Sequence, residues 1–505
     1  MDKSLFIAEK PSVAREFANA LKLNMKSKDG YLEADNAIIT WCVGHLVTMS
    51  YPEAYDEKYR RWSFDTIPFI PKEFKYEVIE GSKKQYMIVS SLLNRADVGT
   101  IYVCTDSGRE GEYIYRLVEQ MAGIKGKLRK RVWIDSQTEE EILRGIREAK
   151  ELSEYDNLSA AAYLRAKEDY LMGINFSRVL TLKYGRTVRD YLKRDKAVIS
   201  VGRVMTCVLG MIVNREREIR TFVKTPFYRV IGNFKLQGRS IPCEWKAVSG
   251  SKYFESPLLY KENGFKEKKT ANELICSLTE GESGRDLFVE NIEIKKENKN
   301  APLLYNLAEL QNDCSKYFKI SPDQTLAIAQ ELYEKKLTTY PRTDARVLSA
   351  AVSKEIHKNI AGLRRYQTCA GLAEEVLRKE SYKGLAKTRY VNDKQITDHY
   401  AIIPTGQGIN NLNSLSPSSA KVYELIVRRF LSIFYPPAVY VKFNLCIKAG
   451  NESFYAGFKV LESEGYLRAS HAKVSDTDEA EEKCDAEIVK LLRALKKGDA
   501  VTADS

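Results

Sequence analysis

The chain has 505 residues, 44% of them hydrophobic and 29% charged, so it can bury several cores, and collagen-like, low-complexity and coiled-coil classes are excluded. Its 80 lysines and arginines against 68 aspartates and glutamates give a net charge of +12, which is typical of proteins that bind a polyanion, although a merely solubilising surface also produces it. Nine cysteines without a C-x-x-C pair argue against zinc ribbons and disulfide frameworks, and without an apolar run of about 20 residues a soluble cytoplasmic protein is expected.

The first 150 residues alternate between predicted strands and helices. Apolar runs at 4–8, 37–43 and 100–104 predict buried strands, and helical patterns follow the first and the third of them. Such alternation predicts a mostly parallel α/β sheet, in which ligands bind beyond the carboxyl ends of the strands. The polar residues at those ends are Glu9, His45, Asp106 and Glu110.

The remainder alternates between helical and β-like segments. Helices are predicted at 158–182 and at 203–222, the second with apolar residues at helical spacing. After a β-like segment the chain is helical again, and a capping box from Ser321 to Gln324 with proline at the first helical position predicts one helix start. A β-like pattern then resumes after 436, which predicts a discontinuous domain.

Three acidic side chains at the predicted strand ends are candidates for a metal site. Glu9, Asp106 and Glu110 offer oxygen ligands, which Mg²⁺ prefers while it keeps several waters. Because like charges raise each other's pKa, one member of such a cluster can also stay protonated and act as an acid. Acids at strand ends often serve as helix N-caps, so the spacing alone leaves these roles open.

The segment Tyr340-Pro-Arg-Thr-Asp344 combines a nucleophile with a cation. A tyrosine attacks phosphorus when its phenol is deprotonated and the phosphate charge is neutralised. Arg342 can supply that neutralisation through a bidentate contact. The chain has 30 tyrosines, most of which must serve packing or the surface, so a packing role for Tyr340 also stays open.

Four further residues have both a functional and a structural interpretation. His399 precedes an apolar stretch, where it can bind a phosphate or cap a loop. Arg165 and Asp169 stand four apart on a predicted helix, which favours an ion pair between them. Arg203 lies at a predicted helix start, and a helix N-terminus beside an arginine suits a phosphate.

Taken together, these motifs resemble the type IA DNA topoisomerases, most closely the topoisomerase III branch. The resemblance covers nearly the whole chain, and the motifs follow the family's order. They are FIAEKPS around Glu9, WCVGHL around His45, TDSGREGE at 105–112, YLMGINFSR at 170–178, SVGRV at 200–204, TTYPRTD around Tyr340 and DHYAIIPT around His399.

The resemblance implies a multidomain fold that is α/β plus α plus β, with a Toprim parallel-sheet domain followed by a toroidal core. The implied parts are the Toprim domain at 1–150, a helical DNA-cradling domain at 151–224, a discontinuous β-rich arch at 225–300 and 436–505, and a helical domain with the nucleophilic tyrosine at 301–435. The family's core normally continues beyond the second β segment, so the chain is expected to lack the C-terminal part of that core.

The resemblance also implies an ATP-independent isomerase. Tyr340 would cleave one DNA strand to a transient 5′-phosphotyrosine, and strand passage and resealing would relax negatively supercoiled DNA or decatenate it. Arg342 and Lys10 would stabilise the scissile phosphate, and Glu9 would protonate the leaving 3′-oxygen. The residues implied to hold Mg²⁺ are Glu9, Asp106 and Glu110, and those implied to contact DNA or organise its site are His399, Arg165, Asp169, Arg203 and Thr343.

One departure concerns the implied metal site. Gly108 stands where the family's D-x-D-x-E pattern has its second acid. One carboxylate fewer is expected to weaken Mg²⁺ binding, and also to lower the pKa of the remaining acids, which would make Glu9 a poorer proton donor.

Two other functions stay open. One is a truncated or degenerate relative that binds single-stranded DNA without turnover. The other is a different Toprim enzyme, a nuclease or a primase, against which the tyrosine motif argues.

Overall fold

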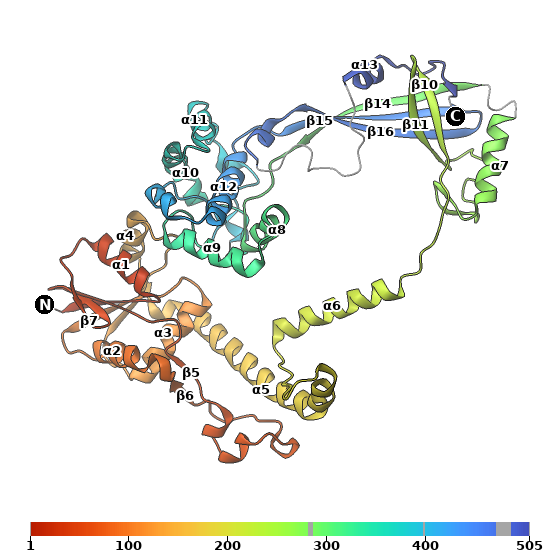
Figure 1. The fold of residues 1–505 in the computed structure, drawn as a ribbon. Helices are drawn as coiled ribbons and strands as arrows, with labels where there is room; N and C mark the ends of the chain where they lie inside the picture. The colour runs from red at the N-terminus through yellow and green to blue at the C-terminus, as the bar shows by residue number, and fades with distance from the viewer. Residues whose placement is uncertain (1, 281–285, 397–398, 471–485, 504–505) are drawn as a thin grey trace. The chain divides into compact units, whose positions relative to one another are not determined.

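The computed structural model describes residues 2–280, 286–396, 399–470 and 486–503. The chain divides into two compact units (Figure 1). The first unit comprises Met1–Thr221, Leu304–Thr368 and Ala386–Ile426, and the second comprises Phe222–Leu303, Cys369–Leu385 and Val427–Ser505. Among the described residues, none of the helices is long and apolar enough to cross a membrane.

A seven-stranded sheet begins the first unit. Its strands are β1 (Lys3–Ala8), β2 (Lys26–Lys28), β3 (Tyr31–Glu33), β4 (Ala37–Trp41), β7 (Val98–Cys104), β8 (Leu128–Arg131) and β9 (Lys150–Glu151). The strand order is β2-β3-β4-β1-β7-β8-β9. The four central strands β4, β1, β7 and β8 are parallel, as the sequence predicted, whereas the edge strands pair antiparallel.

Helices cover both faces of this sheet (Figure 1). On one face lie α1 (Pro11–Leu21) and α4 (Glu139–Arg147), and on the other lie α2 (Lys83–Leu93) and α3 (Arg109–Ala122). Side chains alternate along a strand, so Leu5 and Ile7 of β1 pack with the core of α2 and α3, and Phe6 and Ala8 pack with that of α1 and α4. The sheet therefore holds the ends of β1 and β7 rigidly side by side.

The two predicted helices after this domain are α5 (Asp156–Leu192) and α6 (Arg203–Thr221). A short two-stranded sheet of β5 (Val47–Met49) and β6 (Tyr76–Val78) lies earlier in the same unit. The sequence pattern gave α6 an apolar face, and a helix in a folded domain normally buries such a face. In the described part of the chain that face is exposed, and it consists of Val204, Val208, Met211, Ile212 and Ile219.

The last part of the first unit is helical. It contains α8 (Leu307–Phe318), α9 (Pro322–Glu334) and α10 (Ala350–Gly362), and α12 (Pro417–Ser432) begins in it. The predicted capping box at the start of α9 is present, because Ser321 Oγ accepts from the Gln324 amide and the Gln324 side chain accepts from the Ser321 amide. The Tyr340 segment follows α9 directly.

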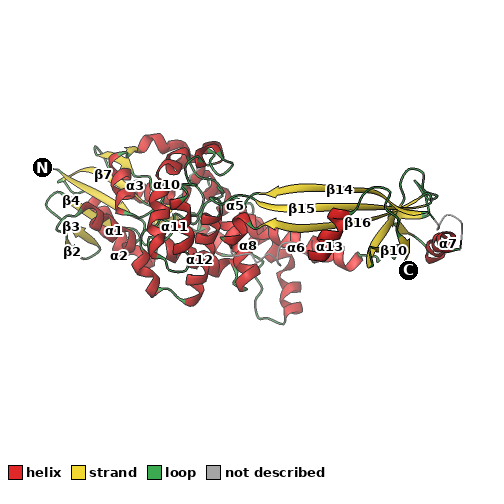
Figure 2. Ribbon diagram, turned by 90° about the horizontal axis from the view of Figure 1, so that it is seen from above, coloured by secondary structure: helices red, strands yellow, loops and turns green. Residues whose placement is uncertain are grey.

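A six-stranded antiparallel sheet forms the second unit (Figure 2). Its strands are β10 (Ile231–Leu236), β11 (Arg239–Lys246), β14 (Leu287–Lys299), β15 (Ala438–Ala449), β16 (Glu452–Ser463) and β17 (Thr502–Ala503). β14 pairs with β15 along almost its whole length, so the sheet joins strands from before and after the helical insertion. The core of this sheet includes Trp245 and Phe443.

The second unit also has helices that the β-like sequence pattern did not predict. They are α7 (Lys268–Thr279) and α13 (Ala486–Ala494). A two-stranded sheet of β12 (Leu259–Lys261) and β13 (Gly264–Phe265) and the helix α11 (Ala370–Arg378) belong to this unit as well. A short helix among strands has too few turns to show a clear helical period. Ala271 and Leu274 nevertheless place α7 against the core of the sheet.

Candidate active site

Two acids meet where β1 and β7 end. Glu9 follows β1, Asp106 follows β7, and the Asp106 amide donates to Glu9 Oε2 at 3.2 Å. Burial and then the charge of Asp106 raise the pKa of Glu9 to about 7, and burial also raises the pKa of Asp106. Burial therefore raises the pKa of Glu9 even with Gly108 in place of the family's second acid, and the effect of that missing acid on proton donation stays a prediction.

A buried arginine holds the loop that carries Asp106. The Arg131 guanidinium donates to the carbonyls of Thr105 and Asp106, both at 2.7 Å. Its Nε lies 3.0 Å from Glu112 Oε2, and both side chains of this ion pair are fully buried. Sequence reasoning missed both residues, since the only signal for Glu112 was its place in the TDSGREGE motif and Arg131 gave none.

Two glycines of the same loop differ in what they require. A Cβ on Gly111 would lie 2.1 Å from the carbonyl oxygen of Asp106, so only glycine fits there. Gly108 has an extended backbone with φ 172°, and a Cβ on it would meet nothing within 4 Å. An acid at position 108 is therefore compatible with this backbone.

Tyr340 reaches the acids from a segment more than 200 residues away along the chain. Its hydroxyl donates to Asp106 Oδ2 at 3.3 Å, and the side chain is only 8% exposed. Its ring packs against Tyr333 and His399, with centroids 5.3 Å and 4.4 Å away. Burial and the charge of Asp106 raise its pKa, so the phenol is neutral and must lose its proton to become a nucleophile.

The loops of Tyr340 and His399 are tied together by buried hydroxyl groups. Thr339 Oγ1 donates to the Ala401 carbonyl at 3.1 Å and accepts from the Ile403 amide at 3.0 Å. Thr343 Oγ1 donates to the His399 carbonyl at 2.8 Å and is buried. Thr343, which the resemblance placed at the DNA, thus holds His399 in place in this structure.

Two cations lie beside the acid pair. Lys10 Nζ lies 3.2 Å from Glu334 Oε1 on α9, and Gln330 Nε2 donates to the same oxygen at 3.0 Å. Arg342 is exposed, and its positive charge lowers the pKa of Glu9 and of Asp106, opposing the effect of burial. An anion bound here would therefore face positive charge both from Lys10, which follows β1, and from Arg342 in the Tyr340 segment.

Glu110 is engaged elsewhere. His45 Nε2 lies 2.6 Å from Glu110 Oε1, and this hydrogen bond lowers the pKa of Glu110 despite partial burial. In the described ranges, no group of three or more histidine, cysteine, aspartate or glutamate side chains is placed to hold a metal ion. Glu9 and Asp106 still fit Mg²⁺, because burial raises both of their pKa values despite the charges of Lys10 and Arg342, and Mg²⁺ often takes one or two carboxylates plus substrate phosphate.

The three candidates on α5 and α6 are exposed. Asp169 accepts from Arg203, with Nε–Oδ1 at 2.8 Å and Nη2–Oδ2 at 3.1 Å. The predicted ion pair of Asp169 with Arg165 is therefore wrong, because Asp169 points across to the start of the next helix. The charge of Arg165 lowers the pKa of both Asp169 and Glu110 without an ion pair to Asp169.

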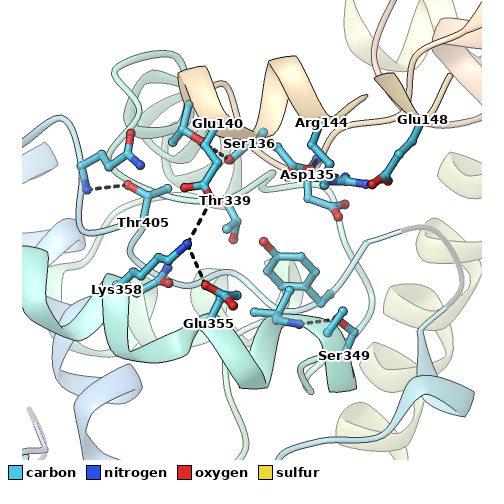
Figure 3. Close-up of a pocket in the computed structure, with 17 residues that line it drawn as sticks. Asp135, Ser136, Glu140, Arg144, Glu148, Thr339, Ser349, Glu355, Lys358 and Thr405 are labelled. Carbon is cyan, nitrogen blue, oxygen red and sulfur yellow. Dashed lines mark hydrogen bonds and ion pairs between the residues drawn. The ribbon is translucent and has the colours of Figure 1, made fainter. Parts of the chain in front are cut away.

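A cavity of about 500 Å³ borders Thr339, the residue before Tyr340 (Figure 3). Asp135, Thr339 and Arg144 are among its lining residues. Lys358 pairs with Glu140 on α4 at 3.0 Å and with Glu355 on its own helix at 2.7 Å. Apolar side chains such as Val352 line it together with these charged groups.

Residues 153–505 match the family described as DNA topoisomerase, and residues 4–136 match the Toprim domain. The chain is 35% identical over 505 residues to DNA topoisomerase 3 of Bacillus subtilis strain 168, covering 99% of this chain and 63% of that protein. It is 35% identical over 507 residues to DNA topoisomerase 3 of Bacillus licheniformis, covering all of this chain and 64% of that protein.

A solved structure has the same fold. Full-length topoisomerase I from Thermotoga maritima superposes with a TM-score of 0.64 at 19% identity, over 99% of this chain and 71% of that one. The chain thus spans under two thirds of the length of the curated relatives described above.

Proposed function

This chain belongs to the type IA DNA topoisomerase family, on its topoisomerase III branch, and from that membership we propose that it cleaves and reseals single DNA strands. The observation that carries the proposal is the contact of the Tyr340 hydroxyl with Asp106 beside Glu9, whose pKa burial raises to about 7. Few arrangements other than nucleophilic attack on an ester require a phenol, a proton acceptor and a proton donor at one point.

The proposed chemistry balances within these groups. The Tyr340 oxygen attacks the scissile phosphorus and passes its proton to Asp106, which its hydroxyl already contacts. Glu9 gives its proton to the leaving 3′-oxygen, for which a pKa of about 7 suits it. The product is a 5′-phosphotyrosine and a free 3′-hydroxyl, and the reverse steps reseal the strand. The ester keeps the energy of the broken bond, so no nucleotide is consumed.

The cations complete the site. Arg342 and Lys10 bind the phosphate, and Lys10 exchanges its partner Glu334 for it. Glu9 and Asp106 are the residues that would hold Mg²⁺, with Glu110 available if His45 releases it. When bound, Mg²⁺ supplies neutralisation of the carboxylate and phosphate charges. Arg165, Asp169, Arg203, His399 and Thr343 contact the DNA or organise its site.

The substrate we propose is single-stranded DNA in negatively supercoiled or catenated molecules, which the chain relaxes or unlinks. The positive net charge supports such a partner. We also propose a division into 1–150, 151–224, 301–435 and an arch of 225–300 with 436–505. The pairing of β14 with β15 supports the arch, since it joins its two halves in one sheet.

The test is incubation with negatively supercoiled plasmid and Mg²⁺, beside a 3′-labelled single-stranded oligonucleotide that carries its label into any covalent adduct. We expect relaxation and an adduct, and the loss of both in Tyr340→Phe with unchanged oligonucleotide binding. An adduct formed by Tyr340→Phe would refute the assignment of the nucleophile. Binding without an adduct at any Mg²⁺ concentration would instead favour a relative that grips single strands without turnover.

A further inference from the structure

Asp135 contacts the nucleophile in a way that the proposed chemistry does not use. It lies between β8 and α4, and its carbonyl accepts from the Tyr340 amide at 3.0 Å. Its carboxylate Oδ1 lies 2.5 Å from His399 Nδ1. Its own amide donates to Glu141 Oε1 at 3.1 Å. One residue thus anchors both the backbone of Tyr340 and the ring that packs on the Tyr340 phenol.

The His399 ring is fixed on every side. Its Nε2 contacts the carbonyl oxygen of Ser107, next to Asp106, and its faces lie against Tyr340 and Trp133, with centroids 4.4 Å and 6.2 Å away. Both nitrogens face acceptors, so the ring makes both hydrogen bonds only when it donates from each. The ring is 4% exposed, and Asp135 supplies the negative charge beside it.

We infer that Asp135 is a positioning residue, which acts through His399 to hold the Tyr340 phenol on Asp106; this inference rests on the proposed function. The carboxylate fixes the rotation of the ring, and the ring closes one side of the slot that contains the phenol. Without the carboxylate, Nδ1 loses its charged partner and the ring can turn about its bond to Cβ. The phenol then has room to leave the line of attack on phosphorus.

Asp135→Asn isolates this role. Asparagine keeps the size of the side chain, and the backbone bonds to Tyr340 and Glu141 do not depend on the carboxylate. We expect the rate of adduct formation with the 3′-labelled oligonucleotide to fall about 10- to 100-fold, as for a misplaced reacting group. Oligonucleotide Kd, measured in a Tyr340→Phe background, is expected to stay within about twofold because Asp135 does not touch the substrate.

Matched variants separate positioning from folding. Glu141→Gln changes a carboxylate that also contacts Asp135, but through the amide, and is expected to keep the wild-type rate. Asp135→Glu keeps the charge and is expected to recover part of the rate, which shows that the charge and not the fold was lost. The midpoint of thermal unfolding is expected to be the same for Asp135→Asn and Glu141→Gln.

A double variant tests the route through His399. His399→Ala removes the ring, so adding Asp135→Asn to it is expected to cost nothing further. Full additivity of the two losses, an unchanged rate in Asp135→Asn, or an equal loss of DNA binding would each overturn the inference while leaving the proposed function intact. A wild-type chain that forms no adduct would overturn both.

Discussion

Replacing Glu112 with glutamine tests whether a buried ion pair holds the loop of the Asp106 acid. Glu112 and Arg131 are both fully buried, and Arg131 also donates to the carbonyls of Thr105 and Asp106. Removing one member of a buried pair leaves the other charge without compensation, which lowers the free energy of unfolding by about 3–5 kcal/mol. The carbonyl oxygens around Arg131 offset part of this loss, so we expect Glu112→Gln to lower it by about 3 kcal/mol.

Hydrogen exchange of native peptides measures this cost locally. A change of about 3 kcal/mol corresponds to about a 150-fold larger opening equilibrium for the amides of β7 and β8. Peptides of β14 and β15 in the second unit are the internal reference, because they do not contact the pair. Glu148→Gln is the matched control, since Glu148 is 57% exposed in its pair with Arg144 and is worth about 0–1 kcal/mol.

Two results would refute the reasoning. An increase below about threefold in β7 and β8 would mean that Arg131 is held by the carbonyls alone. An equal increase in β14 and β15 would mean that the substitution destabilises the whole chain and says nothing about the loop.

Three further predictions follow from single positions. Gly111→Ala forces the Asp106 carbonyl to move, so adduct formation is expected to fall at least about tenfold, whereas Gly108→Ala, which meets open space, keeps the wild-type rate. Gly108→Asp places an acid beside Glu9 and Asp106 and gives α3 a better N-cap. Relaxation is therefore expected to reach half its maximum at a lower Mg²⁺ concentration, and an unchanged Mg²⁺ titration would contradict this prediction. Cys207 is exposed, whereas Cys42 is buried with its pKa raised to about 12, so peptide mapping after alkylation of the native chain is expected to find the first modified and the second protected.

The sequence predicted those features of the fold that depend only on short stretches of the chain. The alternation of Leu5, Phe6 and Ile7 is a local pattern, and so is the capping box at Ser321. The meeting of Glu9 with Asp106 was also within reach, because the ends of neighbouring parallel strands share one edge of a sheet. The family resemblance added Tyr340, which no local pattern separates from the other tyrosines.

Other parts of the site depend on contacts that no local pattern carries. Arg131 and Asp135 look like surface charges in the sequence, and only the fold shows that one is buried and that the other contacts His399. The predicted ion-pair partner of Asp169 was wrong for a related reason. Two arginines lie within reach of Asp169, and only the placement of the two successive helices decides that Arg203 is the one it contacts. Hydrophobic periodicity likewise says which face of α6 is apolar but not what covers it.

The burial of Tyr340 bears on how a phosphate reaches its hydroxyl group. Its hydroxyl lies against Asp106, so in the chemistry we propose a phosphate reaches it when the segment carrying Tyr340 separates from the sheet of the first unit. The two hydrophobic cores on the faces of that sheet are formed by residues that all precede position 163, so this separation leaves both cores intact. The contacts between these two parts of the first unit combine buried ones, such as that of His399 with Asp135, and partly exposed pairs, such as Lys10 with Glu334 and Lys358 with Glu140, which exchange more readily with water. An apolar junction of the same size would resist separation far more strongly, because each buried Å² exposed to water costs about 25 cal/mol.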